Sequence, residues 1–236
     1  MVFQVTPEKL LEYLDFFNGI KYLRNILVNI SFNKSGYVFT DNEKAPTLIV
    51  CSPSPTAWIC FLAGDLASPN IGDILAKIPE KKGILVPVEE EHDWFSVFKQ
   101  QWKQVSHFSR TALSAKSLTF EHVNKLSTSF PAGYSIGKIQ DQEMDYIAKN
   151  WEGWDFMENY HGYCIQEGKN IVSVAIGSLN PLKITQSLEI AIQTLPEYQG
   201  HGLATAVGAK LIAYCIKNGI EPHWDAANDI SVHFAL

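Results

Sequence analysis

Three kinds of feature are scarce or lacking in the sequence, and each absence excludes a class of protein. No apolar run approaches the roughly 18 residues of a membrane-spanning helix, and residues 1–9 lack the basic and apolar regions of a secretory signal. The four cysteines lie far apart without a Cys-x-x-Cys pair, which argues against a disulfide framework and suits a reducing compartment. Basic residues are outnumbered, and the net charge of −6 argues against a nucleic-acid or anionic-membrane partner. We therefore expect a cytoplasmic protein without a membrane or nucleic-acid partner.

Spacings typical of metal sites are lacking as well. The seven histidines form no His-x-x-x-His or His-Glu-x-x-His pair, so the sequence predicts no metal site. The acidic run Glu89–Glu91, which His92 and Asp93 follow, is better explained as the first turn of a helix, because carboxylates favour the positive end of the helix dipole.

What the sequence does contain is ordinary for a folded protein. Apolar residues make up 46% of the 236 residues, enough for a sizeable core and for one large domain or two small ones. The polar stretch Ser127–Gly133, which carries a proline and a glycine, is the best candidate for a boundary. We therefore expect an N-terminal α/β domain at residues 1–130 and a second domain at residues 131–236.

Apolar periodicity predicts strands and helices in both domains. In the first it predicts helices at 7–17, 71–78 and 89–102 and strands at 36–40, 47–51, 58–62 and 83–86. In the second it predicts strands at 134–139, 162–166, 171–178, 188–194 and 222–226, and helices at 141–150, 203–218 and from 228. This order indicates an α/β fold with a mixed sheet of the α+β type, covered by helices.

Short motifs for other chemistries occur without the context that they need. Gly133–Gly137 matches the Gly-x-Ser-x-Gly nucleophile elbow, but Ser135 falls inside a predicted strand and not on a strand-to-helix turn. Gly200–Gly202 begins like a dinucleotide fingerprint, but Thr205 stands where the third glycine belongs. No Gly-Lys-Ser/Thr follows, which excludes a Walker A loop. We therefore favour none of these three sites.

The most informative run is Thr194–Thr205, where an apolar strand passes through Pro196 into a turn that opens a long amphipathic helix. The first N–H groups of a helix lack intrahelical partners, and the helix dipole adds partial positive charge at that end. Gly200 and Gly202 carry no β-carbon, so a bulky diphosphate can approach the backbone. We therefore expect an anion site; a plain strand-to-helix turn, the alternative, needs only one glycine.

The run Gln199–Ala204 matches the Gln/Arg-x-x-Gly-x-Gly/Ala signature, and the sequence resembles the GNAT superfamily of N-acetyltransferases. Residues 222–231 resemble the fifth strand and fourth helix of one branch, the zwittermicin-resistance type, to which 162–164 and 171–173 are also similar. The similarity covers roughly residues 131–236. The first half resembles the N-terminal region of the same branch only loosely, and we interpret it as a degenerate domain without its own cofactor loop.

The resemblance implies the acyl-CoA N-acyltransferase fold and acetyl-CoA as cosubstrate. Backbone amides of the turn and helix start would bind the pyrophosphate, with the Thr205 hydroxyl as a further donor. The edge of the preceding strand would pair with the pantetheine arm, and one of its N–H groups could polarise the thioester carbonyl. The cofactor-binding residues implied are Ile192, Gln193, Thr194, Gln199, Gly200, His201, Gly202, Leu203, Ala204, Thr205 and Asn228.

The reaction implied is direct transfer, in which an amine attacks the thioester and the CoA thiolate leaves. The amine has to lose a proton, and a carboxylate is the usual base. The resemblance implies Glu189 as this base, because it lies on the strand beside the cofactor; an exposed strand glutamate is the structural alternative. Asp225 and Glu197 are weaker candidates.

Aromatic residues occur where this superfamily often builds its acceptor pocket, and they could hold an aliphatic or cationic amine. Core packing explains two of the four equally well. The four residues are Trp151, Trp154, Phe156 and Tyr160.

Two departures from the superfamily pattern concern the end of the sequence. Many members have a tyrosine seven residues after the position of Asn228, where it protonates the thiolate; here that residue is Ala235. Either no acid is needed or another residue supplies it. The sequence stops at Leu236, inside an expected helix that two further strands usually follow, so either it is trimmed or the first half supplies a wall of the acceptor site.

The sequence therefore predicts an acetyl-CoA-dependent N-acetyltransferase that acts on the primary amine of a small molecule in a ternary complex. A catalytically silent protein that binds or senses acyl-CoA is the alternative, and a hydrolase that uses Ser135 is the third reading. The acceptor and the oligomeric state, including a homodimer, stay open.

Overall fold

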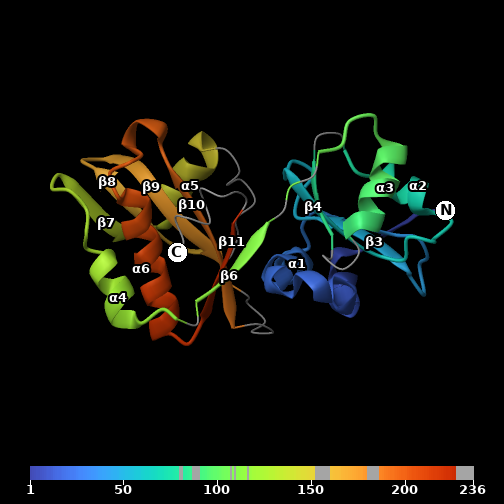
Figure 1. The fold of residues 1–236 in the computed structure, drawn as a ribbon, viewed down its shortest axis with the longest axis horizontal. Coiled ribbons are helices and arrows are strands. Elements are labelled where there is room, and N and C mark those ends of the chain that lie inside the picture. Colours follow the sequence, from blue (N-terminus) through green and yellow to red (C-terminus); the bar gives the residue numbers. More distant parts are fainter. Residues whose placement is uncertain are drawn as a thin grey trace. The chain divides into compact units, whose positions relative to one another are not determined.

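The computed structural model describes residues 1–79, 82–86, 91–106, 108, 110–115, 117–151, 160–179 and 186–226. The chain forms two compact units, Met1–Phe108 and Ser109–Leu236, each described by itself below (Figure 1). Within the residues described, no helix combines the length and the hydropathy needed to cross a membrane.

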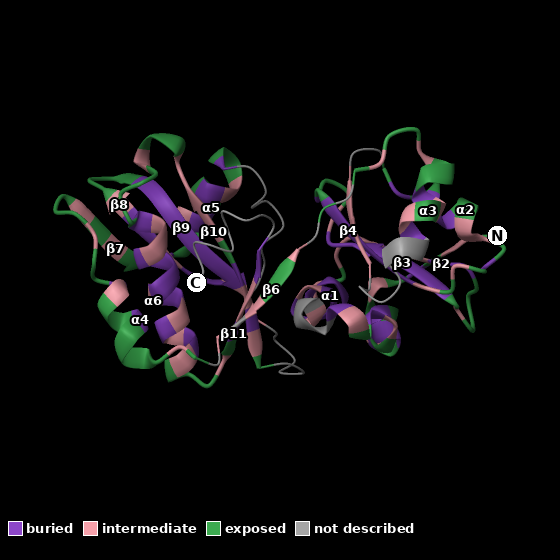
Figure 2. Ribbon diagram, viewed as in Figure 1, coloured by how far each residue is buried: buried purple, intermediate pink, exposed green. Residues whose placement is uncertain are grey.

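The first unit is a five-stranded sheet with helices on both faces. The strand order is β1 (Phe3–Val5), β2 (Tyr37–Thr40), β3 (Leu48–Ser52), β4 (Ile59–Gly64) and β5 (Gly83–Leu85); β4 and β5 are parallel and the other pairs antiparallel. Helices η1 (Pro7–Leu23) and α1 (Arg24–Phe32) pack on one face, and α2 (Ile71–Leu75) and α3 (Glu91–Gln101) pack on the other. Both faces of β3 are therefore buried, as Figure 2 shows.

The second unit is a six-stranded mixed sheet in the order β6-β11-β10-β9-β8-β7. Only β10 and β11 pair in parallel among these strands. The bounds are β6 (Thr111–Ser114), β7 (Tyr134–Lys138), β8 (Tyr160–Glu167), β9 (Asn170–Ser178), β10 (Ser187–Thr194) and β11 (Glu221–Ala226).

Helices cover both faces of this second sheet. Helix α6 (Leu203–Lys217) packs on one face, where it meets Leu188, Ile190 and Ile192 of β10. Helix α5 (Asp141–Asn150) packs on the other face, and α4 (Phe120–Leu126) packs on the outer side of α6. Because strand residues alternate between faces, Glu189 lies on the α5 face.

The predicted elements agree with the structure where apolar periodicity is strong. The predicted helix 141–150 is α5, the predicted helix 203–218 is α6, and the predicted strands 171–178 and 188–194 are β9 and β10 within one residue at each end. The predicted first helix differs: η1 continues to Leu23, with its non-helical angles at Phe17 and Ile20, whose side chains are buried. The predicted helix from 228 lies outside the described residues.

The boundary between the two units lies between Phe108 and Ser109, earlier than the boundary at residue 130 expected from the sequence. Two short elements that the sequence did not predict account for the difference. Strand β6 is the edge strand of the second sheet and pairs with β11, and α4 packs against α6, so residues 109–130 are part of the second unit.

Candidate active site

Strands β10 and β11 separate partway along their length. Their parallel register runs from Ser187↔Glu221 to Glu189↔His223 and then ends. Strand β10 continues to Thr194, paired with β9 throughout, while β11 continues to Ala226, paired with β6. From Ile190 to Thr194, the edge of β10 that faces away from β9 has therefore left the β11 ladder. Such an edge can pair with an extended ligand.

The turn after β10 leads into the N-terminus of α6. Gly200 has φ 80° and Gly202 has φ 73°, both in the left-handed region that favours glycine. Among the described residues, a β-carbon on Gly200 would meet nothing within 4 Å, and one on Gly202 only the Ser129 carbonyl oxygen at 3.8 Å. The two glycines are therefore needed for their backbone conformation, and no described residue fills the space in front of them.

The start of α6 offers backbone donors to an anion. The first bond inside the helix runs from the Ala206 N–H to the Gly202 carbonyl, so the N–H groups before Ala206 have no intrahelical acceptor. The N-cap residue is Gly202, which has no side chain that could accept a hydrogen bond from these N–H groups. Leu203 anchors this turn in the core at 1% exposure. These donors and the helix dipole make the turn suitable for a phosphate group.

The remaining side chains of the turn differ in their contacts and exposure. Gln199 donates through Nε2 to the Thr194 carbonyl at 3.2 Å, which ties the turn to the end of β10. The Thr194 hydroxyl is hydrogen-bonded to that of Ser173 at 2.7 Å. His201 is exposed, and Ala204 and Thr205 are half-buried in the first turn of α6.

Glu189 lies at the point where the two strands separate, and its carboxylate replaces a strand-to-strand bond. Its Oε1 accepts a hydrogen bond from the Asp225 backbone N–H at 3.0 Å. Its Oε2 is buried and has no hydrogen-bond partner among the described residues. Asp225 is 8% exposed, and its carboxylate accepts from Arg110 Nε, while Arg110 also donates to the Asp225 carbonyl at 2.9 Å. Two carboxyl groups and one guanidinium thus meet at the fork, which is the point after Glu189 and His223 where β10 and β11 separate.

Burial and mutual repulsion change how these two acids titrate. Burial is the largest cause that raises the pKa of Glu189 to about 8; the Asp225 charge raises it further, while the Asp225 N–H and Arg110 oppose the rise. The pKa of Asp225 is also raised by burial, against the effect of Arg110. Because Arg110 bonds Asp225 directly, we expect Asp225 to hold the negative charge and Glu189 to be the group that exchanges a proton near neutral pH.

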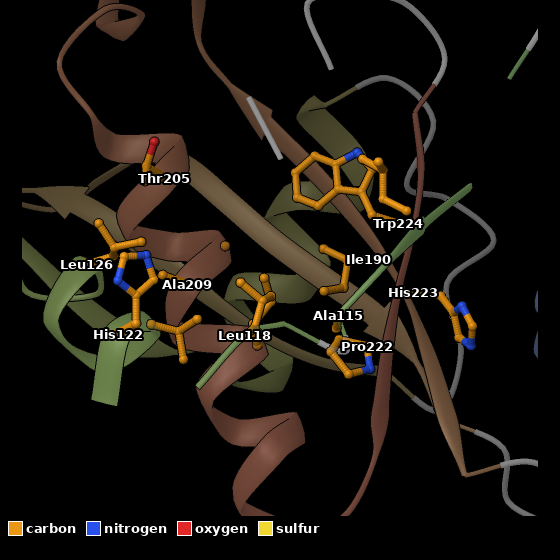
Figure 3. Close-up of a pocket in the computed structure, with 14 residues that line it drawn as sticks. Ala115, Leu118, His122, Leu126, Ile190, Thr205, Ala209, Pro222, His223 and Trp224 are labelled. Atoms are coloured by element: carbon orange, nitrogen blue, oxygen red, sulfur yellow. The ribbon is translucent and has the colours of Figure 1, made fainter. Parts of the chain in front are cut away.

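A pocket of about 340 Å³ lies on the other face of the sheet, beside α6. Residues of β6, α4, β10, α6 and β11 line it. Figure 3 shows Thr205 toward one end of the pocket and Leu118 and Pro222 toward the other, while the ring of His223 points away from them. The lining is mainly apolar, with Ile190 and Trp224 on its strand side.

Of the other residues expected at the site, Tyr160 lies in register with Glu189 on the α5 face, and the rest lie elsewhere or outside the described residues. Trp151 is 6% exposed and packs in the core with α5. The Tyr160 hydroxyl donates to Asp141 at 3.1 Å, and burial is the largest cause that raises its pKa to about 12. Glu197 is exposed in η3 (Pro196–Tyr198), away from the fork. Outside the described residues lie Trp154, Phe156, Asn228 and Ala235.

Arg110 is the site residue that the sequence did not indicate. It reaches the fork because β6 pairs with β11, which places the start of β6 beside Asp225. The strand is only four residues long and gives no clear apolar alternation, so the sequence showed no more than an arginine before a short segment. Ser135, by contrast, lies inside β7 as expected, and not on a strand-to-helix turn.

Comparisons with known proteins agree on one family. A family model described as GNAT acetyltransferase matches residues 16–236. The chain is 25% identical over 221 residues to a protein of Bacillus subtilis (strain 168) named "Uncharacterized N-acetyltransferase YdfB", covering 85% of this chain and 79% of that protein.

Solved structures show the same fold over the whole chain. A GCN5-related N-acetyltransferase-like protein from Streptococcus suis 89/1591 superposes with a TM-score of 0.75 at 21% identity, covering 98% of this chain and 93% of that one. A tandem GNAT protein from the clavulanic acid biosynthesis pathway superposes with a TM-score of 0.59 at 11% identity, covering 100% of this chain and 93% of that one. The family match is consistent with the separated strands β10 and β11 and with the glycine turn. The chain belongs to the GNAT acetyltransferase family.

Proposed function

We propose that the protein transfers an acetyl group from acetyl-CoA to the primary amine of a small molecule, with both substrates bound together. The observation that carries this proposal is the position of Glu189, a buried carboxyl at the fork of β10 and β11, on the same strand as the edge that leads to the glycine turn. Family membership supports acetyl transfer, and the fork supports its site.

The residues of the turn and of β10 fit acetyl-CoA. The N–H groups of Gly200–Thr205 would hold the pyrophosphate, since this stretch combines open space with helix-end donors. The β10 edge at Ile192–Thr194 would hold the pantetheine arm by strand-like hydrogen bonds. The bound thioester supplies the acetyl group. Asn228, outside the described residues, stays a further contact in this proposal.

Glu189 would accept the proton of the attacking amine. The amine nitrogen forms the amide bond with the acyl carbon, the carbon–sulfur bond breaks, the thiolate leaves, and the amine proton passes to Glu189. A carboxylate with a pKa of about 8 is a stronger base than an ordinary glutamate, and its pKa is close to the working pH. Asp225 fits the part of base less well, because Arg110 pairs with its Oδ2 and opposes the rise in its pKa that burial causes, which makes it a weaker base.

The acceptor would approach from the α5 face. Strand register places Tyr160, Ser178, Glu189 and His223 in one row across four strands, so their side chains share that face. This row has hydroxyl, carboxyl and imidazole groups, which suit a polar amine. We propose a small-molecule acceptor on this basis, and the first unit as a degenerate relative of the second, in line with the likeness to a tandem GNAT protein.

Two further expectations stay part of this proposal: membership of the zwittermicin-resistance branch and a cytoplasmic location. The oligomeric state stays open, and a homodimer is the state to test first. None of them changes the chemistry argued from the fork.

An acceptor screen with acetyl-CoA, read out as release of free thiol, tests the function. We expect release that depends on an amine, and we expect Glu189→Gln to abolish it while acetyl-CoA binding, measured by calorimetry, is kept. Asn124→Gln, a substitution at an exposed position of α4, is the control and should leave thiol release and acetyl-CoA binding unchanged. Binding of acetyl-CoA without turnover of any amine would favour the silent acyl-CoA-binding protein, and absence of binding would contradict both functions.

A further inference from the structure

The pocket beside α6 continues past the point where β10 and β11 separate. The last paired residues of the two strands are Glu189 and His223, and Ile190, the next residue of β10, lines the pocket. Pro222 also lines it, although Pro222 is still paired with Leu188. One part of the pocket therefore lies beside the open fork and another part beside the closed ladder.

The pocket also extends along α6, and its two ends lie beside different parts of this helix. Thr205 lies in the first turn of α6 and Ile212 lies seven residues later, and both line the pocket. At 1.5 Å per residue, these positions are about 10 Å apart along the helix axis. The Thr205 end is next to the anion-binding turn, and the Ile212 end is about two turns deeper.

The deep end cannot serve the pantetheine arm in the way that the stretch of β10 beyond the β11 ladder can. Beside Pro222 the backbone groups of β10 are engaged with β11, so no strand edge is available there to an extended amide chain. The side chains at this end, Leu118, Ile212 and Pro222, offer no hydrogen-bonding group. An apolar group attached beyond the thioester is what this end can take.

The amine acceptor is not the occupant that the geometry favours. Glu189 points to the α5 face, whereas Ile190 and Trp224 line the pocket on the α6 face. A nucleophile that reaches Glu189 therefore comes from the opposite side of the sheet. The donor alone passes from the turn of α6 along β10 toward the pocket.

We propose that this pocket binds the acyl chain of the donor thioester, so that the preferred donor is an acyl-CoA longer than acetyl-CoA. The proposal rests on the proposed function and changes only the group transferred. The amide bond still forms at the acyl carbon, the carbon–sulfur bond still breaks, and the amine proton still passes to Glu189. An acetyl group, with a single methyl, would leave the deep end of the pocket, beside Ile212 and Pro222, unfilled.

Calorimetric titration of the full chain with CoA, acetyl-CoA, butyryl-CoA and hexanoyl-CoA tests this directly. Each buried methylene contributes ~0.8 kcal/mol, which corresponds to roughly a fourfold lower Kd. We therefore expect butyryl-CoA to bind roughly 15-fold more tightly than acetyl-CoA, and hexanoyl-CoA more tightly again until the pocket is full.

A pocket-filling variant locates the effect. Leu118→Trp places a large ring at the deep end, and we expect it to remove the preference for longer chains while acetyl-CoA still binds. Asn124→Trp introduces the same side chain on an exposed position of α4 that does not line the pocket, and should keep the preference.

Two outcomes separate the inference from the function on which it rests. Affinity that stays level or falls with chain length in the unchanged protein would overturn the acyl-chain pocket and leave the acetyltransferase intact. Loss of binding for CoA and all thioesters would overturn the proposed function itself. If circular dichroism shows that Leu118→Trp does not fold, the chain-length series of the unchanged protein decides alone.

Discussion

Glu189→Gln should make the second unit more stable than the unchanged protein at alkaline pH. The pKa of Glu189 is about 8 in the folded protein, against an ordinary value of 4.5. Because folding raises this pKa, the folded state holds the proton more tightly. The contribution of the proton to stability is fully present below pH 4.5 and is lost as the pH rises through 8.

The magnitude follows from the two pKa values. At ~1.4 kcal/mol per pKa unit, the difference between 4.5 and about 8 corresponds to at most ~5 kcal/mol of unfolding free energy. Glutamine has nearly the same shape, keeps an oxygen that accepts from the Asp225 N–H, and does not titrate. The stability difference between variant and unchanged protein should therefore grow by ~2–5 kcal/mol from pH 5 to pH 9.

Urea unfolding at a series of pH values measures this difference through the transition midpoints. Because the chain has two units, the transition of the second unit has to be identified first. Leu211→Ala, a cavity at a fully buried position of α6, should move that transition alone. Glu197→Gln, at an exposed glutamate, is the matched control and should leave the pH dependence unchanged. Parallel pH curves for Glu189→Gln and the unchanged protein would refute the buried, proton-holding carboxyl.

Two further predictions concern the turn and the guanidinium. Gly202→Ala and Gly219→Ala both place a methyl group on a residue with positive φ and open surroundings, so each should cost ~1–2 kcal/mol of stability. Titration calorimetry should find weaker CoA binding only for Gly202→Ala, and equal binding by the two variants would contradict the anion site. Arg110→Gln removes the cation that lowers the pKa of both Asp225 and Glu189, so the pH dependence of acyl transfer should move to higher pH. A pH profile that does not move would show that Arg110 has only a structural role.

The backbone conformation of the glycine turn was predictable because all of its information is local. Two glycines around one residue, a strand before them and an amphipathic helix after them are visible in a single stretch of sequence, and the structure places Gly200 and Gly202 at positive φ. The main helices and strands of the second unit were predictable for a similar reason. Their apolar positions repeat with the period of the element that they form.

The fork chemistry was not predictable, because it depends on contacts between distant residues. Arg110 and Asp225 are 115 positions apart and meet only because an edge strand pairs across the sheet. Strand β6 pairs through backbone groups, which any short polar sequence can supply, so it leaves no pattern to read. The pocket likewise depends on how α4 packs over α6, and neither α4 nor β6 was expected.

The pH dependence of kcat/KM tests most directly whether Glu189 accepts the amine proton. The assay needs an acceptor amine that is itself uncharged over the whole pH range, so that the profile reports on the enzyme. We expect kcat/KM to rise tenfold per pH unit up to a pKa near 8 and then level off, because only ionised Glu189 accepts the proton. In Glu189→Gln this limb should vanish together with most of the rate. A variant that keeps the unchanged rate and the same limb near pH 8 would contradict the account.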